Sequence, residues 1–94
     1  MHWQVVLHRR AQRELDELPD HLREETLSII DGFEEGVFPP DVLLLHGEPK
    51  TYRAYFGKNF RVVWQAYPHS RRIVVSRLRP RATAYKGFRR AQDR

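Results

Sequence analysis

The apolar residues near the start of the chain follow first a strand pattern and then a helical one. Residues His2 to Leu7 are rich in β-branched and apolar side chains, which predicts a strand. Ala11, Leu15 and Leu18 then recur at the i, i+4, i+7 spacing that places side chains on one face of a helix. Pro19 is expected to end this helix, because proline disrupts the hydrogen bonds of a helix interior.

A second helix is predicted directly after Pro19. We expect Asp20 to cap its N-terminus, because a short carboxylate can accept hydrogen bonds from the free amides of the first turn. Gly36 and the pair Pro39-Pro40 should end it. Its apolar residues continue the stripe of the first helix and are Leu22, Ile29, Ile30 and Phe33. The two helices are therefore predicted to form an antiparallel hairpin.

In the second half of the chain the period of the apolar residues changes from 3.6 to 2, which predicts strands. Residues 52–56, 60–66 and 73–78 are interpreted as three consecutive strands. Turns are expected at Gly57-Lys58-Asn59 and at Pro68-His69-Ser70. Residues 41–50 are interpreted as a connection that carries an apolar patch.

The first of these turns sets a register between its two strands. If Phe56 faces Phe60, then Tyr55 lies opposite Arg61 and Arg53 opposite Val63. One face of the sheet then holds Arg53, Tyr55, Arg61 and Gln65, and the other holds the large apolar residues. We expect the helices to cover the apolar face, with Trp64 and Phe60 packed against Leu15, Leu18, Ile29, Ile30 and Phe33. The basic face is predicted to be open.

Together these elements predict a single α+β domain over residues 1–94, with an N-terminal strand, an antiparallel two-helix hairpin and a three-stranded antiparallel meander. A short basic segment or helix follows. The composition, 40% hydrophobic and 31% charged, is typical of soluble globular proteins. There is no cysteine, and no apolar stretch approaches the roughly 20 residues of a membrane span. We expect a cytoplasmic protein without a membrane partner or secretory signal.

The charge is segregated along the chain. Residues 1–49 hold four Lys or Arg and eleven Asp or Glu, whereas residues 50–94 hold thirteen and one. A basic half with aromatic residues interleaved favours a nucleic-acid surface. A solvated basic face, or a face that meets an acidic protein, is the alternative.

The residue types exclude several kinds of active site. The histidines His2, His8, His21, His46 and His69 are not spaced as metal ligands, and no nucleophile elbow or phosphate-binding glycine loop occurs. We therefore expect neither a metal nor a cofactor. The remaining Arg, Lys, Tyr and His residues can cleave RNA without a metal, by holding the strand so that a ribose 2′-OH attacks its neighbouring phosphate.

The order of elements and several short motifs resemble the RelE/ParE toxin superfamily of bacterial and archaeal toxin–antitoxin pairs. The motifs are Leu45-x-Gly47, Tyr52-Arg53, Gly57, the stretch from Phe60 to Trp64, and a terminal basic element ending in Tyr85. The resemblance covers about residues 3 to 88. It implies a toxin that cleaves messenger RNA in the ribosomal A site, in the RelE branch, or that inhibits DNA gyrase, in the ParE branch.

The resemblance also implies a set of site residues. Arg53 takes the place of the first strand cation, Arg61 that of a phosphate-binding arginine, Arg79 or Arg81 that of the arginine after the last strand, and Tyr85 that of a tyrosine near the C-terminus. We predict these five as catalytic residues, and further RNA contacts from Lys50, Tyr55, Lys58, Arg77 and Lys86. Tyr55 stands where RelE members with proton-transferring lysines have a second cation. Proton transfer then falls to Tyr85, Lys58, Lys86 or a histidine, with His46 one candidate.

The partners implied by the resemblance are a cognate antitoxin, messenger RNA and the ribosome. A heterotetramer or larger complex with the antitoxin, able to bind operator DNA, is one further expectation. An inactive member that only joins such a complex is the third possibility besides the nuclease and the gyrase inhibitor.

Overall fold

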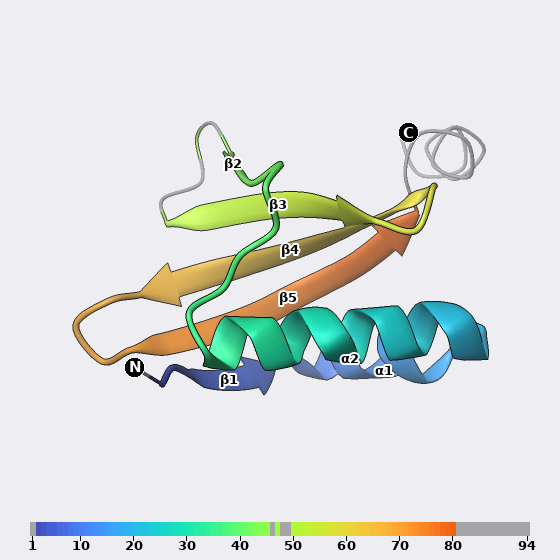
Figure 1. The fold of residues 1–94 in the computed structure, drawn as a ribbon, viewed down its shortest axis with the longest axis horizontal. Helices are drawn as coiled ribbons and strands as arrows, with labels where there is room; N and C mark the ends of the chain where they lie inside the picture. Colours follow the sequence, from blue (N-terminus) through green and yellow to red (C-terminus); the bar gives the residue numbers. More distant parts are fainter. Residues whose placement is uncertain (1, 46, 48–49, 81–94) are drawn as a thin grey trace.

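Two helices pack on one face of a mixed sheet in the computed structural model, which describes residues 2–45, 47 and 50–80 (Figure 1). The elements in chain order are β1 (Gln4–Leu7), α1 (Arg9–Asp16), α2 (Asp20–Glu34), β2 (Leu43–Leu44), β3 (Thr51–Phe56), β4 (Phe60–Tyr67) and β5 (Arg72–Pro80). The predicted N-terminal strand, helical hairpin and three-stranded meander are all confirmed. The predicted basic segment after the meander lies outside the described residues.

Within the described residues, the sheet has five strands in the order β1-β5-β4-β3-β2. β1 pairs in parallel with β5 at one edge of the sheet. The helices connect β1 to β2 at the opposite edge, and the meander then leads back to β5. β2 pairs with β3 in an antiparallel manner, with Leu43 opposite Arg53 and Leu44 opposite Tyr52. The connection predicted over residues 41–50 therefore contains an edge strand, which at two residues is too short to produce a periodic pattern.

The predicted cap of α2 is wrong. Pro19 occupies the N-cap position, and its carbonyl accepts hydrogen bonds from the amides of Leu22, at 3.0 Å, and Arg23, at 2.9 Å. Asp20 is instead the first helical residue and forms an ion pair with Arg23. Its carboxylate still lies in the first turn, where the positive end of the helix dipole favours an anion.

The predicted register between β3 and β4 is confirmed: Phe56 pairs with Phe60, Tyr55 with Arg61 and Arg53 with Val63. The turn between these strands requires a glycine. Gly57 has φ +57°, and a Cβ atom at this position would lie 2.7 Å from Cδ2 of Leu22 on α2. The amide of Gly57 donates to the Glu25 carboxylate at 3.1 Å, so α2 fixes the turn directly.

The core lies between the helices and the inner face of the sheet, as predicted. Trp64 is 1% exposed, and its ring centroid lies 4.6 Å from that of Phe33. Leu15 and Leu18 belong to the same cluster, and Ile29 and Phe60 pack against it as partly buried residues. The full cluster is Ala11, Leu15, Leu18, Leu22, Phe33, Ala54, Phe56, Val62, Trp64, Ile73, Val75 and Leu78. Within the described part of the chain, no helix is both long and apolar enough to cross a membrane.

We predict that Trp64→Ala destabilises the domain by roughly 3 to 5 kcal/mol, because it removes the largest buried side chain and leaves a cavity against Phe33. That is a large part of the roughly 5 to 15 kcal/mol that stabilises a typical domain. Urea unfolding followed by circular dichroism measures the change. In a Trp3→Phe background the remaining Trp64 should emit as a buried indole, and a water-exposed emission spectrum would mean that the two sheet faces are reversed.

Candidate nucleic-acid interface

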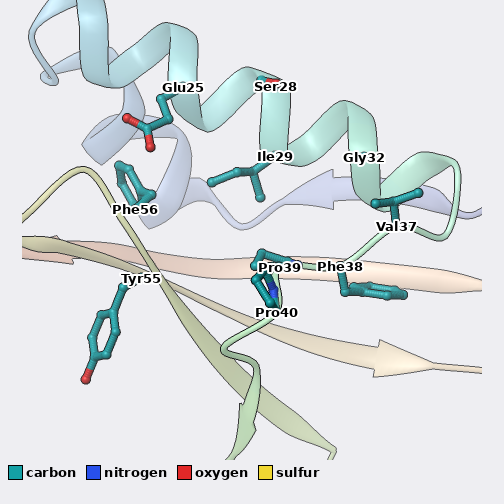
Figure 2. A pocket seen from close by; sticks show the side chains of 10 residues that line it. All are labelled: Glu25, Ser28, Ile29, Gly32, Val37, Phe38, Pro39, Pro40, Tyr55 and Phe56. Carbon is teal, nitrogen blue, oxygen red and sulfur yellow. The ribbon is translucent and has the colours of Figure 1, made fainter.

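The sheet face turned away from the helices is basic, as the alternation predicts. On β3, Phe56 points toward α2 whereas Tyr55 points the opposite way (Figure 2). We use the name open face for the side chains of Arg53, Tyr55, Arg61, Gln65, Arg77 and Arg79, which lie on this side of β3, β4 and β5. All six are partly exposed.

An extra residue in β5 brings two arginines onto the open face. Val63 pairs with Arg77 but the next residue, Trp64, pairs with Val75, so Ser76 has no partner of its own in the ladder. Such a bulge reverses the alternation of the side chains. Val75 therefore points into the core and, three residues later, Leu78 does so again, while Arg77 and Arg79 face outward. The Ser76 hydroxyl donates to the Val63 carbonyl at 3.2 Å and holds the bulge in place.

Three of the predicted site residues form one row across the open face. Tyr55 pairs with Arg61, and Arg61 pairs with Arg79, so one residue each from β3, β4 and β5 stands side by side. Directly paired residues have Cβ atoms about 4.5 to 5.5 Å apart, which puts the whole row within roughly 11 Å. The side chain of Arg61 makes no hydrogen bond or ion pair with any residue that the structure describes.

Arg53 stands beside this row and orients the tyrosine. Its guanidinium carbon lies 4.4 Å from the centroid of the Tyr55 ring, a cation–π contact between residues two apart on the same face of β3. Arg53 is also the cross-strand partner of Val63. The predicted cations Arg53, Arg61 and Arg79 are thus brought together around Tyr55.

Arg77, in contrast, forms an ion pair with a carboxylate. Its guanidinium donates to Glu14 on α1, with Nη2 2.9 Å and Nε 3.1 Å from Oε2. The other oxygen of Glu14 accepts the backbone amide of Leu78 at 2.7 Å. Both side chains are about three-quarters buried. Glu14 therefore covers the edge of β5 beyond the end of β1, and it neutralises one cation of the open face.

Two further carboxylates from the acidic half bind backbone amides of the basic half. Asp41 accepts from the amide of Tyr55 at 3.1 Å, on the edge of β3 just beyond the end of β2. Glu25 accepts from Gly57 in the turn. The sequence analysis did not single out Glu14, Asp41 or Glu25, and their partners lie too far along the chain for a local pattern to indicate them.

The other predicted site residues lie at the ends of the open face or outside the described residues. Lys58 is exposed in the turn between β3 and β4. Lys50 lies just before β3, with its Nζ 5.6 Å from the centroid of the Tyr67 ring. Arg81, Tyr85 and Lys86, as well as His46, fall outside the described residues.

Neither of two cavities in the described structure is lined by Arg61 or Arg79, although Tyr55 lines the first of them. One of about 380 Å³ lies between α2, the segment after it and β3, with Ile29 and Phe56 pointing into it (Figure 2). A second, of about 340 Å³, is lined mainly by Trp3, Phe38, Tyr52 and Trp64. Residues 2–45, 47 and 50–80 contain no group of three His, Asp or Glu residues placed to hold a metal ion. The candidate site is therefore a surface row of cations rather than a pocket.

Solved structures of similar fold are RelE toxins. The archaeal RelE of the RelE–RelB complex from Pyrococcus horikoshii OT3 is 26% identical, with a TM-score of 0.76 over 88% of this chain and 99% of that one. The toxin–antitoxin complex RelBE2 from Mycobacterium tuberculosis gives 20% identity and a TM-score of 0.71, covering 86% and 100%. The isolated E. coli RelE toxin is 19% identical, with a TM-score of 0.66 over 95% of this chain and 97% of that one. No family model and no curated protein matches the sequence.

The architecture thus defines a small α+β protein of the RelE-like fold. The resemblance to the RelE/ParE toxin superfamily is confirmed, and this chain is a RelE-like member of it. The similarity supports a toxin role.

We predict that Glu14→Ala destabilises the domain by roughly 2 to 3 kcal/mol, because it leaves both the Leu78 amide and the Arg77 guanidinium without their partner. Glu14→Gln should be milder, since its amide oxygen can still accept the Leu78 amide. The comparison is made by urea unfolding, with Glu17→Ala, at the exposed C-cap of the same helix, as the control. Equal stability of Glu14→Ala and Glu17→Ala would contradict this role.

Proposed function

We propose that this protein is the toxin of a type II toxin–antitoxin pair and acts as a metal-independent endonuclease on messenger RNA in the ribosomal A site. The observation that carries the proposal is the row of Tyr55, Arg61 and Arg79 on an open sheet face, with Arg53 stacked beside it. The likeness to RelE toxins supports the same function. The toxin would then work in the cytoplasm, where translation takes place.

The chemistry asked of the protein is phosphate activation. A ribose 2′-OH attacks the adjacent phosphorus, the bond from phosphorus to the 5′ oxygen breaks, and the products carry a 2′,3′-cyclic phosphate and a 5′-OH. Arg61 and Arg79 offer forked donors to the phosphoryl oxygens, on which negative charge grows. Arg53 holds the Tyr55 ring and adds positive charge beside the row.

Proton transfer needs other groups, because arginine keeps its proton. We assign it to Tyr85, Lys58 or Lys86, with Lys58 in the turn beside the row. Another group is needed because Tyr55 stands at the strand position where the resemblance implies a second cation.

Dependence on the ribosome fits the shape of the face. Neither cavity described above is lined by Arg61 or Arg79, so these two arginines offer little by themselves to bend a strand into line for attack. A strand already bent and held in the A site removes that requirement, and orientation of the reacting groups is a large part of the barrier.

Inhibition of DNA gyrase is the second candidate function, and Tyr55 is the observation that favours it. A tyrosine at the β3 end of the row weakens the case for proton transfer by strand residues but still suits contact with a protein surface. In that case the protein binds its target without cutting RNA.

A cognate antitoxin is the proposed partner, supported by the RelE–RelB and RelBE complexes among the similar structures. The open face attracts an acidic segment, and exposed apolar residues near it, such as Leu43 and Leu44, offer area to bury. We further propose that toxin and antitoxin assemble into a heterotetramer or larger complex that binds operator DNA.

We predict that Arg61→Ala relieves growth arrest while the fold is kept, because Arg61 contributes nothing to the core. Loss of one oriented phosphate contact typically costs on the order of 2 to 4 kcal/mol at the transition state, or roughly thirtyfold to a thousandfold in rate. Growth after induction and mapping of messenger RNA ends measure the effect.

Arg9→Ala is the matched control. Arg9 is exposed on α1, so the substitution removes one positive charge at a place outside the open face. Arg61→Lys should recover only part of the activity, since lysine lacks the forked geometry. Full toxicity of Arg61→Ala at equal protein level would remove this residue from the site. Growth arrest with intact messages and an induced DNA-damage response would favour the gyrase candidate instead.

We also predict that the association rate of toxin and antitoxin falls as salt rises, because exposed cations are screened over about 10 Å at 0.1 M. The dissociation rate should change little, since buried apolar contacts are insensitive to salt. Surface plasmon resonance between about 50 mM and about 500 mM salt tests this. A constant association rate would mean that the antitoxin first meets the acidic helical side.

A further inference from the structure

Tyr67 presents an aromatic ring at the far end of the open face from Tyr55. It is the last residue of β4, and the alternation along the strand puts it on the same side as Arg61 and Gln65. Its hydroxyl donates to Oε1 of Gln65 at 3.3 Å, which agrees with that placement. The residue is 37% exposed, so part of the ring is open to a ligand.

Lys50 lies beside this ring, and its own backbone conformation is unfavourable. Its φ is +58°, in the left-handed region that suits glycine, while its carbonyl accepts the amide of Ala66 at 3.1 Å. Glycine would satisfy the same backbone with less strain, so the turn alone gives no reason for a lysine. The side chain places its ammonium 5.6 Å from the centroid of the Tyr67 ring.

The pair of Lys50 and Tyr67 repeats the arrangement of Arg53 and Tyr55. Both consist of a cation over a tyrosine ring, and both lie on the open face. Arg61, which is opposite Tyr55, and Tyr67 are six positions apart on β4, or about 20 Å at the rise of a strand. That span accommodates several nucleotides of an extended strand. Stacking of bases on aromatic rings, with cations along the backbone, is how proteins hold single-stranded nucleic acid.

We propose that Tyr67 and Lys50 form a second nucleotide subsite, in which a base of single-stranded RNA stacks on Tyr67 and the Lys50 ammonium contacts the adjoining phosphate. The inference rests on the proposed function, because it assumes that RNA lies along the open face. Neither residue touches the reacting atoms. They are positioning residues, and their effect is to decide which phosphate of the strand lies at the Arg61 row.

The test combines two measurements on the full chain. Fluorescence anisotropy with a labelled single-stranded oligoribonucleotide measures binding, and mapping of message ends in a translating extract measures where the strand is cut. Tyr67→Ala should weaken binding roughly 5- to 150-fold, the range that loss of one stacked base produces, and should spread the cut sites. Tyr67→Phe keeps the ring and should bind within about twofold of wild type.

Lys50→Gly separates a structural from a binding role. Glycine tolerates φ +58°, so the melting temperature should hold or rise, while the slope of log K against log salt should fall by about 1 because one phosphate contact is lost. Arg9→Ala, with the same change of charge, should leave the slope as it is.

Several results would overturn the inference. Wild-type binding and unchanged cut sites in Tyr67→Ala would do so while the proposed function stands, and equal losses in Tyr67→Phe would exclude stacking. An unchanged salt slope in Lys50→Gly would remove Lys50 from the subsite. If the wild-type protein neither binds nor cuts RNA, the proposed function fails together with the inference.

Discussion

The carboxylate of Glu14 joins the two halves of this molecule. One oxygen accepts the Leu78 amide at the exposed edge of β5, and the other binds the Arg77 guanidinium. Without it, β5 would present an unpaired amide at the point where β1 has ended and α1 takes over as its neighbour. Asp41 does the same for the Tyr55 amide on the opposite side of the sheet, and Glu25 holds the turn at Gly57. The carboxylates of the acidic half thus contact the basic half largely at backbone amides.

This use of carboxylates has an electrostatic consequence. Acids that bind amides at the sheet edges and in the turn do not neutralise the arginines in the middle of the open face. Glu14 does bind Arg77, which lies next to the edge that Glu14 covers. Arg53 and Arg61 remain as cations beside Tyr55, held close together by strand pairing rather than by counter-charges. Repulsion between them is compensated by the core beneath, where Trp64 and Phe33 pack. Stability and charge are therefore supplied by opposite faces of one sheet.

The parts of the fold that could be predicted are those set by local pattern. Alternation in β3 and β4, with a glycine turn between them, was enough to give the register and both faces of the sheet. The features that were wrongly predicted or missed have both local and non-local causes. Asp20 was predicted to be the N-cap of α2, but the N-cap lies one residue earlier, at Pro19. β2 exists only because Leu43 and Leu44 find β3 as a partner. The engagement of Arg77 depends on a residue on α1, and nothing in the neighbourhood of Arg77 in the sequence indicates it.

The bulge at Ser76 lets β5 hold one residue more than regular pairing with β4 requires. Val75 and Leu78 both face the core although an odd number of positions separates them, and Arg77 and Arg79 keep the outward direction because Ser76 takes up the offset. Without Ser76 the strand would alternate regularly, with Leu78 still inward and Arg77 and Arg79 still outward. An inserted residue that no second bulge absorbed would instead turn the two arginines inward and Leu78 outward. A sequence alignment of related chains should therefore tolerate a one-residue gap at position 76, because Leu78 and the two arginines keep their directions without it.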